Sequence, residues 1–353
     1  MKILVAIPCL LTGGTEIQTL SLIEAAVAAG HSVAVAVYFE HSEAMRARYE
    51  CAGARVMLLS PDGSRPDGVV ATARFLWRGL RRAVRELRPD LAHVQYMAPG
   101  AMPVMILKAL GVRRILATAH TSGDIYSPRG LKLVKWLVSN CLDGFQCITL
   151  RAEEAFFGPG SAALFDPSAP PRSHYTIYNT LPSYISIAPE PRRFDSGAPL
   201  TIGVVSRLEA IKGMDLVVPA FAQIRRGQSD AVKLLIVGDG SLRRSMERQA
   251  VEHGIADAVE FAGRQGQDTL QACYDRIDIL LMPSRSEGFG LTAIEAMARG
   301  AVVVASDTGG LPEVVTPEVG ILCTPGSAEA LAAATVTLLA EGPRSLAARS
   351  TAA

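Results

Sequence analysis

The chain has 353 residues, which is more than one hydrophobic core usually organises, so we expect two domains. Hydrophobic residues make up 49% of the chain, but no apolar run approaches the roughly 20 residues that a membrane-spanning helix needs. The net charge of +1 conceals a basic region, because residues 65–135 contain 13 Lys and Arg against 4 Asp and Glu.

The first residues and the cysteines bear on the compartment. Residues 1–11 are apolar, but they include a single lysine and Pro8 and lead directly into Thr12-Gly13-Gly14, which favours a first strand over a signal peptide. Six cysteines form no CxxC motif and have no histidine at zinc spacing. We expect them to be small buried residues in a reducing compartment, and the protein to be cytoplasmic.

Short apolar runs alternate with helical patterns through the first half of the chain. One helix, predicted over residues 16–29, ends at Gly30, a typical C-cap residue. The loop of residues 8–15 carries Gly13 and Gly14, although many turns of this kind contain two glycines. Repeated βα units predict a parallel sheet with helices on both faces. The predicted strands are 3–7, 33–37, 56–59, 91–94, 115–118 and 146–148.

A basic amphipathic helix is predicted over residues 74–88, whose sequence is RFLWRGLRRAVRELR. Such a helix can lie on an anionic membrane surface. It can equally be an ordinary surface helix of a βαβ unit with solvated arginines. Residues 129–138 are a second candidate, because Trp136 favours membrane interfaces and Lys132 and Lys135 are basic.

His120 follows a predicted strand and opens the polar segment HTSGDIYSPRG. The carboxyl end of a parallel strand is where ligands bind in such sheets, although an isolated histidine is more often structural. Asp124, Tyr126 and Arg129 are candidates for the acceptor side of a site.

The middle of the chain has little periodicity. Residues 158–173 predict a long surface loop, and residues 175–178 return to strand character before Asn179. The proline-rich residues 182–199 predict a linker between domains. The predicted domains are therefore residues 1–181 and 200–353.

The second half begins with a predicted strand at 200–205, followed by Arg207 and Lys212 in the loop before a helix. An arginine fork and a lysine at this spacing can converge on one diphosphate, although solvated charges are also common in such loops. Further strands at 233–237 and 259–262 end at Gly238 and Gly263. The last predicted helix is 331–339.

Residues 283–315 carry the most informative pattern. They follow the buried apolar strand 277–282, and the turn after it contains Glu287, Gly288 and Gly290 before a helix that begins at Leu291. The first amides of a helix lack internal partners, so this unit can bind an anion. Glu295 lies one turn into the helix, and a carboxylate accepts two hydrogen bonds from a vicinal diol. The pattern suits a ligand with phosphate between two sugars.

This segment resembles the donor site of retaining glycosyltransferases of the GT-B fold, glycosyltransferase family 4. The resemblance rests on Glu287, seven intervening residues and Glu295, and it continues through Gly309, Gly310 and Glu313. Other motifs of the family occur in the expected order over nearly the whole chain. One departure is Asn179-Thr180-Leu181-Pro182, where the family usually has Asn-Gly, an apolar residue and Asp.

The resemblance implies a fold of two Rossmann-like domains, a first for the acceptor and a second for the nucleotide sugar. It implies that Arg207 and Lys212 contact the leaving diphosphate, and that Glu287 and His120 contact the transferred sugar. Glu295 would hold the ribose. The other implied donor-binding residues are Gly13, Gly14, Gly238, Gly263, Arg264, Gly288, Phe289, Gly290 and Leu291. Because positive side chains take the place of a metal in this fold, no metal or cofactor is expected.

We therefore expect a hexosyltransferase that moves a sugar, with retention, from a UDP-sugar or a GDP-sugar to an acceptor hydroxyl. A role in polysaccharide biosynthesis, with a lipid-linked saccharide or a small molecule as acceptor, fits this interpretation. The expected location is the cytoplasm or the inner face of the membrane, and nucleic acid is not an expected partner. A nucleotide-sugar epimerase of related fold and a non-catalytic nucleotide-sugar-binding protein remain alternatives, whereas the absence of GxGxxG after the first strand disfavours a dehydrogenase.

Overall fold

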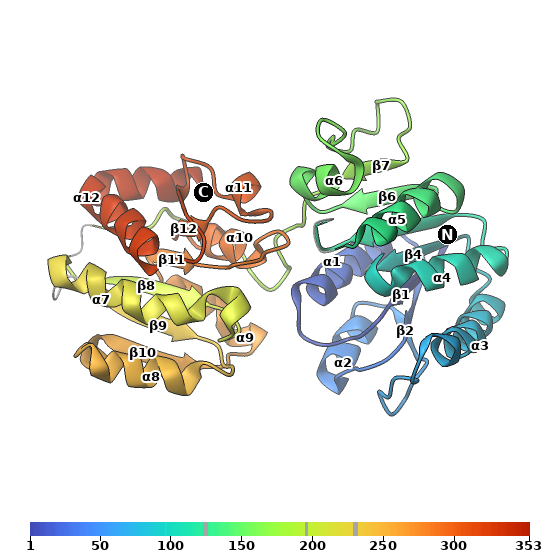
Figure 1. The fold of residues 1–353 in the computed structure, drawn as a ribbon, viewed down its shortest axis with the longest axis horizontal. Coiled ribbons are helices and arrows are strands. Elements are labelled where there is room, and N and C mark those ends of the chain that lie inside the picture. Colours follow the sequence, from blue (N-terminus) through green and yellow to red (C-terminus); the bar gives the residue numbers. More distant parts are fainter. Residues whose placement is uncertain (96, 123–125, 195–196, 229–231) are drawn as a thin grey trace. The chain divides into compact units, whose positions relative to one another are not determined.

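The computed structural model describes the chain except residues 96, 123–125, 195–196 and 229–231. The chain divides into two compact units, Met1–Thr180 and Leu181–Ala353. Each unit contains its own sheet flanked by helices (Figure 1). Every pairing between the named strands of the described residues is parallel, which confirms the predicted α/β fold with two parallel sheets.

The first unit has a seven-stranded sheet in the order β3-β2-β1-β4-β5-β6-β7. Its inner strands are buried on both faces, as Leu4, Val5, Ala6 and Ile7 of β1 show, and this explains why they are short apolar runs in the sequence. The elements are β1 Lys2–Ile7, α1 Gly14–Ala28, β2 Ser32–Val37, α2 Glu43–Cys51, β3 Arg55–Leu58, α3 Val69–Leu87, β4 Leu91–Gln95, α4 Met97–Ala109, β5 Ile115–Ala119, α5 Pro128–Asn140, β6 Gly144–Cys147, α6 Leu150–Phe157 and β7 His174–Thr176.

Two of these elements begin earlier than the sequence predicts. Strand β6 starts at Gly144, where the prediction starts at Gln146, and Gly144 pairs with Leu116 of β5. A Cβ atom at Gly144 would lie 3.0 Å from the Tyr175 hydroxyl, so a close neighbour accounts for a glycine inside a strand. Helix α3 starts at Val69, five residues before the predicted Arg74.

The second unit has a six-stranded sheet in the order β10-β9-β8-β11-β12-β13. Side chains of β9 alternate between two cores: Leu234 joins the core beneath α7 and α12, and Leu235 joins the core beneath α9 and α10. The elements are β8 Leu200–Val205, α7 Val217–Gln228, β9 Val232–Val237, α8 Arg243–Glu252, β10 Val259–Gly263, α9 Gln267–Asp275, β11 Ile279–Met282, α10 Leu291–Ala298, β12 Val302–Ser306, α11 Leu311–Val314, β13 Gly320–Cys323 and α12 Ala328–Ala352.

The end of the chain differs from the prediction of a last helix at 331–339. Helix α12 runs from Ala328 to Ala352 and is broken at Gly342, which has φ 80° and is followed by Pro343. The prediction that the last helix ends at residue 339 is therefore wrong. Leu346, beyond the break, is buried in the core of the second unit, so the second segment belongs to that core.

The segment predicted as a linker packs on the second unit. Ile185 is buried in its core, and the Ala188 amide donates to the Ala298 carbonyl at 2.7 Å. The Arg192 guanidinium binds the Asp278 carboxylate at 3.1 Å. These contacts fix residues 185–192 to α10 and to the start of β11.

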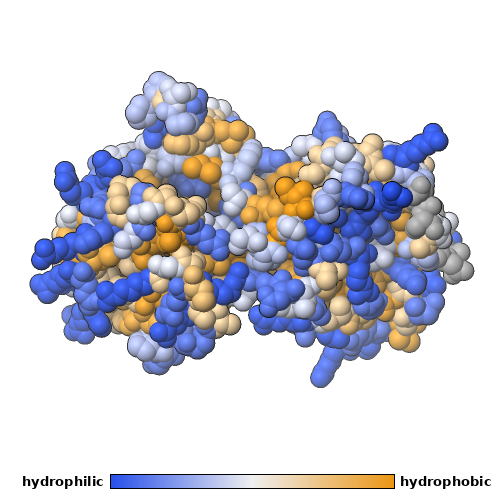
Figure 2. Space-filling model, turned by 180° about the vertical axis from the view of Figure 1, so that it is seen from behind, coloured by the Kyte–Doolittle hydropathy of each residue, from blue (hydrophilic) through white to orange (hydrophobic). Residues whose placement is uncertain are grey.

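The cysteines are free, as expected, but they are not uniformly buried. Cys51 is exposed at the end of α2, and Cys9 and Cys323 are intermediate. The expectation of six buried cysteines is wrong for these three. In the described residues no helix is both long and apolar enough to cross a bilayer. Hydrophilic side chains cover much of the surface visible in Figure 2, with smaller apolar patches between them.

Candidate functional site

Loops after four strands of the second unit meet at the carboxyl end of its sheet. The Arg285 amide, after β11, donates to the Ile211 carbonyl, after β8, at 3.0 Å. A Cβ at Gly238, after β9, would lie 1.8 Å from the Ser206 carbonyl oxygen. A Cβ at Gly309, after β12, would lie 1.7 Å from the Glu287 carbonyl oxygen. Glycine is therefore required where these loops touch.

The strand order explains why a ligand would bind there. Strands β8 and β11 are neighbours in the sheet but are not consecutive in the chain, so the strand order reverses between them. Ligands of open α/β sheets bind outside the carboxyl ends of the strands at such a switch point. The loops carrying Arg207, Lys212 and Glu287 follow β8 and β11.

Lys212 and Glu287 lie in contact. The Lys212 Nζ donates to Glu287 Oε2 at 2.8 Å, and the Ser284 hydroxyl donates to the same oxygen at 3.2 Å. Both charged side chains are largely buried. A pair in this setting gains more from its attraction than a fully exposed pair does, provided that each group keeps its hydrogen bonds. The contact holds an acidic and a basic group side by side at the switch point.

Arg207 follows β8 and is exposed. Its guanidinium makes no hydrogen bond or ion pair with any residue in the described part of the chain. Its nearby charge helps to lower the pKa of Glu209, after a larger effect from the Ser241 hydroxyl. The side chain is thus placed at the loop but is not tied down by an acidic partner, unlike Lys212.

Glu295 lies in α10 with both carboxylate oxygens engaged. The Tyr184 hydroxyl donates to Oε1 at 2.7 Å, and the Tyr274 hydroxyl donates to Oε2 at 2.5 Å. Glu295 is only 5% exposed. Burial raises the pKa of this carboxyl above its usual value, and the two hydroxyls act in the opposite direction.

The N-cap of helix α10 is Gly290, which has φ 103° and ψ 47°. Within the described residues no side chain caps this end, whereas the Ser327 hydroxyl caps α12 by accepting from the Ala330 amide. The first amides of α10 therefore lack a side-chain acceptor, and the helix dipole makes this end favourable for an anion. Of the other predicted donor-binding residues in this unit, Phe289 is buried, Gly288 precedes it, Leu291 begins α10, Gly263 ends β10 and Arg264 is exposed after it.

The predicted glycine loop of the first unit is organised by Glu16. Gly13 is the N-cap of α1, which begins at Gly14, and a Cβ at Gly13 would lie 2.6 Å from Glu16 Oε2. The Cys9 thiol donates to Glu16 Oε1 at 3.2 Å, and the Tyr49 hydroxyl donates to the Glu16 carbonyl at 2.6 Å. Burial raises the pKa of the Glu16 carboxyl. The missing side chain at position 13 makes room for this carboxylate.

His120 follows β5, as predicted, and its Nε2 lies 2.8 Å from Oε1 of Gln95 at the end of β4. Beside this pair, His93 Nε2 lies 2.7 Å from the Thr118 hydroxyl. Burial is the main cause that lowers the pKa of His120 to about 3 and the sole cause that lowers the pKa of His93 to about 4, so both rings are neutral near pH 7.

Of the three candidates for the acceptor side, Tyr126 packs edge-on against Phe156 with ring centroids 5.2 Å apart. Arg129 is exposed near the start of α5. Asp124 lies outside the described residues. An acceptor side formed by these three residues therefore stays a prediction.

The sequence analysis did not identify three residues whose side chains hydrogen-bond to predicted site residues. Gln95 contacts His120, and Tyr184 and Tyr274 donate to Glu295. Gln95 directly follows the predicted strand 91–94, at the carboxyl end of a parallel strand, where ligands bind in such sheets. Tyr274 lies 21 positions from Glu295 and Tyr184 lies 111 positions from it, and no local pattern links either pair.

Comparison with known proteins extends over both units. Residues 13–150 match the model of a glycosyl transferase 4-like domain, and residues 190–353 match that of glycosyl transferases group 1. The chain is 28% identical over 282 residues to a GDP-mannose-dependent alpha-(1-6)-phosphatidylinositol monomannoside mannosyltransferase of Mycobacterium tuberculosis, covering 76% of this chain and 71% of that protein. It is 36% identical over 148 residues to a D-inositol 3-phosphate glycosyltransferase of Segniliparus rotundus, covering 40% of this chain and 33% of that protein.

Solved structures share the fold. HepE of Anabaena, crystallised with UDP and glucose, matches with a TM-score of 0.76 at 21% identity, over 99% of this chain and 92% of that one. The lipopolysaccharide outer core galactosyltransferase WaaB matches with a TM-score of 0.73 at 19% identity, over 97% and 91%. With its two parallel-sheet units and both domain models matched, the chain belongs to the glycosyl transferases group 1 family and is a glycosyltransferase of the GT-B fold.

Proposed function

We propose that this glycosyltransferase moves a sugar from a nucleotide-diphosphate donor to an acceptor hydroxyl with retention of configuration. The observation that carries the proposal is the meeting of the loops after β8 and β11, with Lys212 bound to Glu287 and the uncapped start of α10 in the same connection. A pyrophosphate needs positive charge and free amides, and a sugar needs carboxylates for its hydroxyls.

The chemistry requires stabilisation of negative charge on the departing diphosphate. Arg207, Lys212 and the first amides of α10 would supply it, and such preorganised electrostatic stabilisation is usually the largest catalytic contribution. Glu287 and His120 would orient the transferred sugar. Attack on the same face as the leaving group, with the leaving phosphate helping to take the acceptor proton, requires no side-chain base.

For the donor we favour a UDP-sugar, with a GDP-sugar as the alternative. HepE of Anabaena has the same fold and was crystallised with UDP, and the mannosyltransferase of M. tuberculosis is GDP-mannose-dependent. Glu295 would bind the ribose, while Gly263 and Arg264 would lie beside the base. Gly13 and Gly14, at the start of α1, would approach the donor phosphates. We propose that the reaction needs no metal ion.

Donor turnover tests the proposal. The enzyme is incubated with a panel of UDP-sugars and GDP-sugars, with and without acceptors, and the released nucleotide is measured. Arg207→Ala and Lys212→Ala should each lower turnover by about 10² to 10³, the loss seen when one preorganised donor is removed. Arg276→Ala is the matched control, because Arg276 is exposed and pairs with Glu260 on β10. Wild-type turnover in both site variants would contradict the assignment, and an isomerised sugar from donor alone would indicate an epimerase.

We also propose that α3 places the enzyme on an anionic membrane surface. Val70, Arg74, Trp77 and Arg81 follow one another at helical spacing, and Val70 and Trp77 are 65% and 39% exposed. In the described part of the chain, Arg74, Arg78, Arg81 and Arg85 make no hydrogen bond or ion pair. Exposed arginines interleaved with exposed apolar side chains suit the headgroup region of a bilayer.

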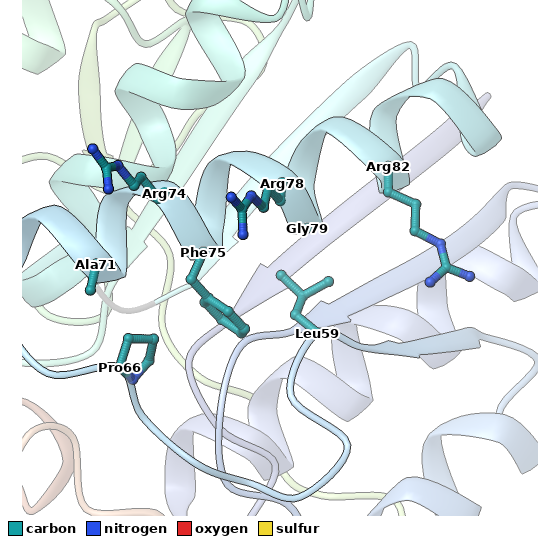
Figure 3. A pocket seen from close by; sticks show the side chains of 8 residues that line it. All are labelled: Leu59, Pro66, Ala71, Arg74, Phe75, Arg78, Gly79 and Arg82. Atoms are coloured by element: carbon teal, nitrogen blue, oxygen red, sulfur yellow. The ribbon is translucent and has the colours of Figure 1, made fainter.

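The residues that line a groove beside α3 suit the binding of a phospholipid headgroup. A cavity of about 500 Å³ beside α3 is lined by Arg74, Arg78 and Arg82 and by apolar residues that include Leu59 and Phe75. Figure 3 shows these side chains. Arg82 also binds Glu86, so Arg74 and Arg78 carry the uncompensated charge. A phosphate ester attached to an acyl chain meets both kinds of lining.

Liposome flotation tests this part of the proposal. The protein should float with vesicles that contain anionic phospholipid at low salt, and should stay in solution with vesicles of phosphatidylcholine alone or at high salt. Arg74→Glu with Arg78→Glu should abolish flotation without changing turnover of a soluble acceptor, and Arg276→Glu is the control. Failure to float at low salt with anionic vesicles would remove the membrane proposal and leave the transferase proposal intact.

A further inference from the structure

We infer that the Tyr184 hydroxyl is an exchangeable partner of Glu295, one that the ribose of a bound nucleotide displaces, whereas the Tyr274 hydroxyl is a permanent partner. This inference rests on the proposed role of Glu295 in holding the donor ribose. It adds two positioning residues to the site, and it predicts that only the exchangeable one, Tyr184, opposes nucleotide binding.

The geometry around Glu295 imitates a bound diol. One hydroxyl donates to each carboxylate oxygen, Tyr184 to Oε1 at 2.7 Å and Tyr274 to Oε2 at 2.5 Å. A vicinal diol offers the same chemistry, two neighbouring O–H donors for one carboxylate. Because Glu295 is almost fully buried, a ribose that binds it directly must share its oxygens with these hydroxyls or replace one of them.

The Tyr274 hydroxyl cannot move away from Glu295 without disrupting the packing of the core around its ring. It lies near the end of α9 with its side chain fully buried in the core beneath α9 and α10. Its carbonyl oxygen is held by the Arg192 guanidinium at 3.0 Å. Moving the ring would create a cavity the size of an aromatic side chain, so this hydroxyl stays on Oε2.

Tyr184 packs against the same core, but it is only partly buried there. It is partly exposed, and it belongs to the irregular segment that follows the boundary between the units at residue 180. The residues after it are anchored independently, since Ile185 is buried and the Ser186 amide donates to Gln271 Oε1 at 2.9 Å. The Tyr184 side chain can therefore turn away from Glu295 while the backbone keeps its place.

The exchange has a thermodynamic consequence. In the free enzyme the Tyr184 hydroxyl stabilises the buried carboxylate, and this stabilisation is lost when a ribose hydroxyl takes over Oε1. Tyr184 thus weakens nucleotide binding by the net free energy of one hydrogen bond. Removing the hydroxyl therefore removes a competitor for Oε1 from the free state.

Calorimetric titration of the full chain with UDP and GDP tests the inference. Tyr184→Phe should lower the Kd of the preferred nucleotide by about 3- to 10-fold, which corresponds to one net hydrogen bond. Tyr274→Phe is the matched change on the same carboxylate. It should lower the melting temperature, because it leaves a buried oxygen with one donor fewer, but it should change the Kd by less than twofold, because the lost hydrogen bond is present in both the free and the bound protein. In a Glu295→Ala background, Tyr184→Phe should change the Kd by less than twofold.

The outcomes separate the inference from the proposed function. An unchanged or raised Kd in Tyr184→Phe, with normal binding by the wild type, would overturn the exchange and leave the transferase proposal standing. A gain in affinity that persists without Glu295 would also overturn it, because the effect would then bypass the carboxylate. A wild-type protein that binds no nucleoside diphosphate would overturn both.

Discussion

Gly309 shows how a single missing side chain shapes the candidate donor site. Its φ is 53°, and a Cβ there would lie 1.7 Å from the Glu287 carbonyl oxygen. Gly309→Ala should lower the free energy of unfolding by about 2 to 4 kcal/mol, from left-handed strain and from overpacking against backbone. Because the clash pushes the loop that carries Glu287, donor turnover should fall as well. Denaturant melts and turnover assays measure the two effects.

Gly326 provides the control for this substitution. It has φ 80°, but no atom outside its chain neighbours lies within 4 Å of a Cβ built there. Gly326→Ala should therefore cost only the conformational strain, about 1 to 2 kcal/mol, and leave turnover unchanged. Equal effects of the two substitutions would show that contact with the Glu287 loop contributes nothing.

His93 makes stability depend on pH. Burial lowers its pKa to about 4, whereas an unfolded histidine has a pKa near 6.5. Between these values the unfolded chain binds a proton that the folded chain does not, so the free energy of unfolding falls as pH decreases from about 6.5 toward 4. The slope reaches about 1.4 kcal/mol per pH unit for this one group.

His93→Gln removes the titration but keeps an amide that can donate to the Thr118 hydroxyl, as His93 Nε2 does. Urea melts at pH 7, 6 and 5 should therefore show a shallower loss of stability in the variant than in the wild type. The neighbouring His120, whose burial lowers its pKa to about 3, contributes to the dependence that remains in the variant. Parallel slopes in the two proteins would contradict a neutral, buried His93.

At the scale of single residues, the sequence is informative where function depends on a local pattern. Glu287, Glu295 and Gly290 stand within nine positions of each other, so their common turn and helix could be predicted. Their partners could not be, because Lys212 reaches Glu287 across 75 positions and Tyr184 reaches Glu295 across 111. Such contacts depend on the order of strands in the sheet, which no local spacing records.

At the scale of elements, buried strands were the most predictable. Strand β8, predicted at 200–205, is found at Leu200–Val205, because a strand covered on both faces must be apolar throughout. Helix ends were harder to predict. The first turn of α3 is Val69-Val70-Ala71-Thr72-Ala73, where β-branched residues weaken the helical signal and the N-cap Gly68 supplies no side-chain cap in the described structure. In α12, Gly342 and Pro343 predict an end where the chain instead bends and continues.

The helical segment after Gly342 should be a structural part of the second unit. Leu346 is 1% exposed and packs in the core beneath α7 and α12. Leu346→Ala should lower the free energy of unfolding by about 2 to 5 kcal/mol, the cost of a cavity in a packed core. Arg344→Ala, at an exposed position in the same segment, should change it by less than about 0.5 kcal/mol. If both variants melt like the wild type, the segment does not pack in solution as it does in the structure.

At the scale of the whole molecule, each unit has hydrophobic clusters of its own. Leu80 and Phe145 belong to the core of the first unit, and Phe221 and Leu281 belong to a core of the second. A core of this kind allows each unit to unfold as a cooperative body, so calorimetry of the full chain should resolve two transitions. Leu346→Ala identifies the second unit, because it should lower the midpoint of that transition alone.

Nucleotide binding should then act on one transition of the two. Most of the residues proposed to hold the donor, including Lys212, Glu287 and Glu295, belong to the second unit, so UDP or GDP should raise the transition that Leu346→Ala lowers. At a ligand concentration of 100 times Kd, mass action stabilises the binding unit by about 2.7 kcal/mol. The transition of the first unit should move by much less, because only the Gly13 loop and His120 would contact the donor from it. An equal shift of both transitions would mean that the first unit supplies a comparable share of the binding free energy. A shift of the first unit's transition alone would show that the nucleotide does not bind at the loops after β8 and β11.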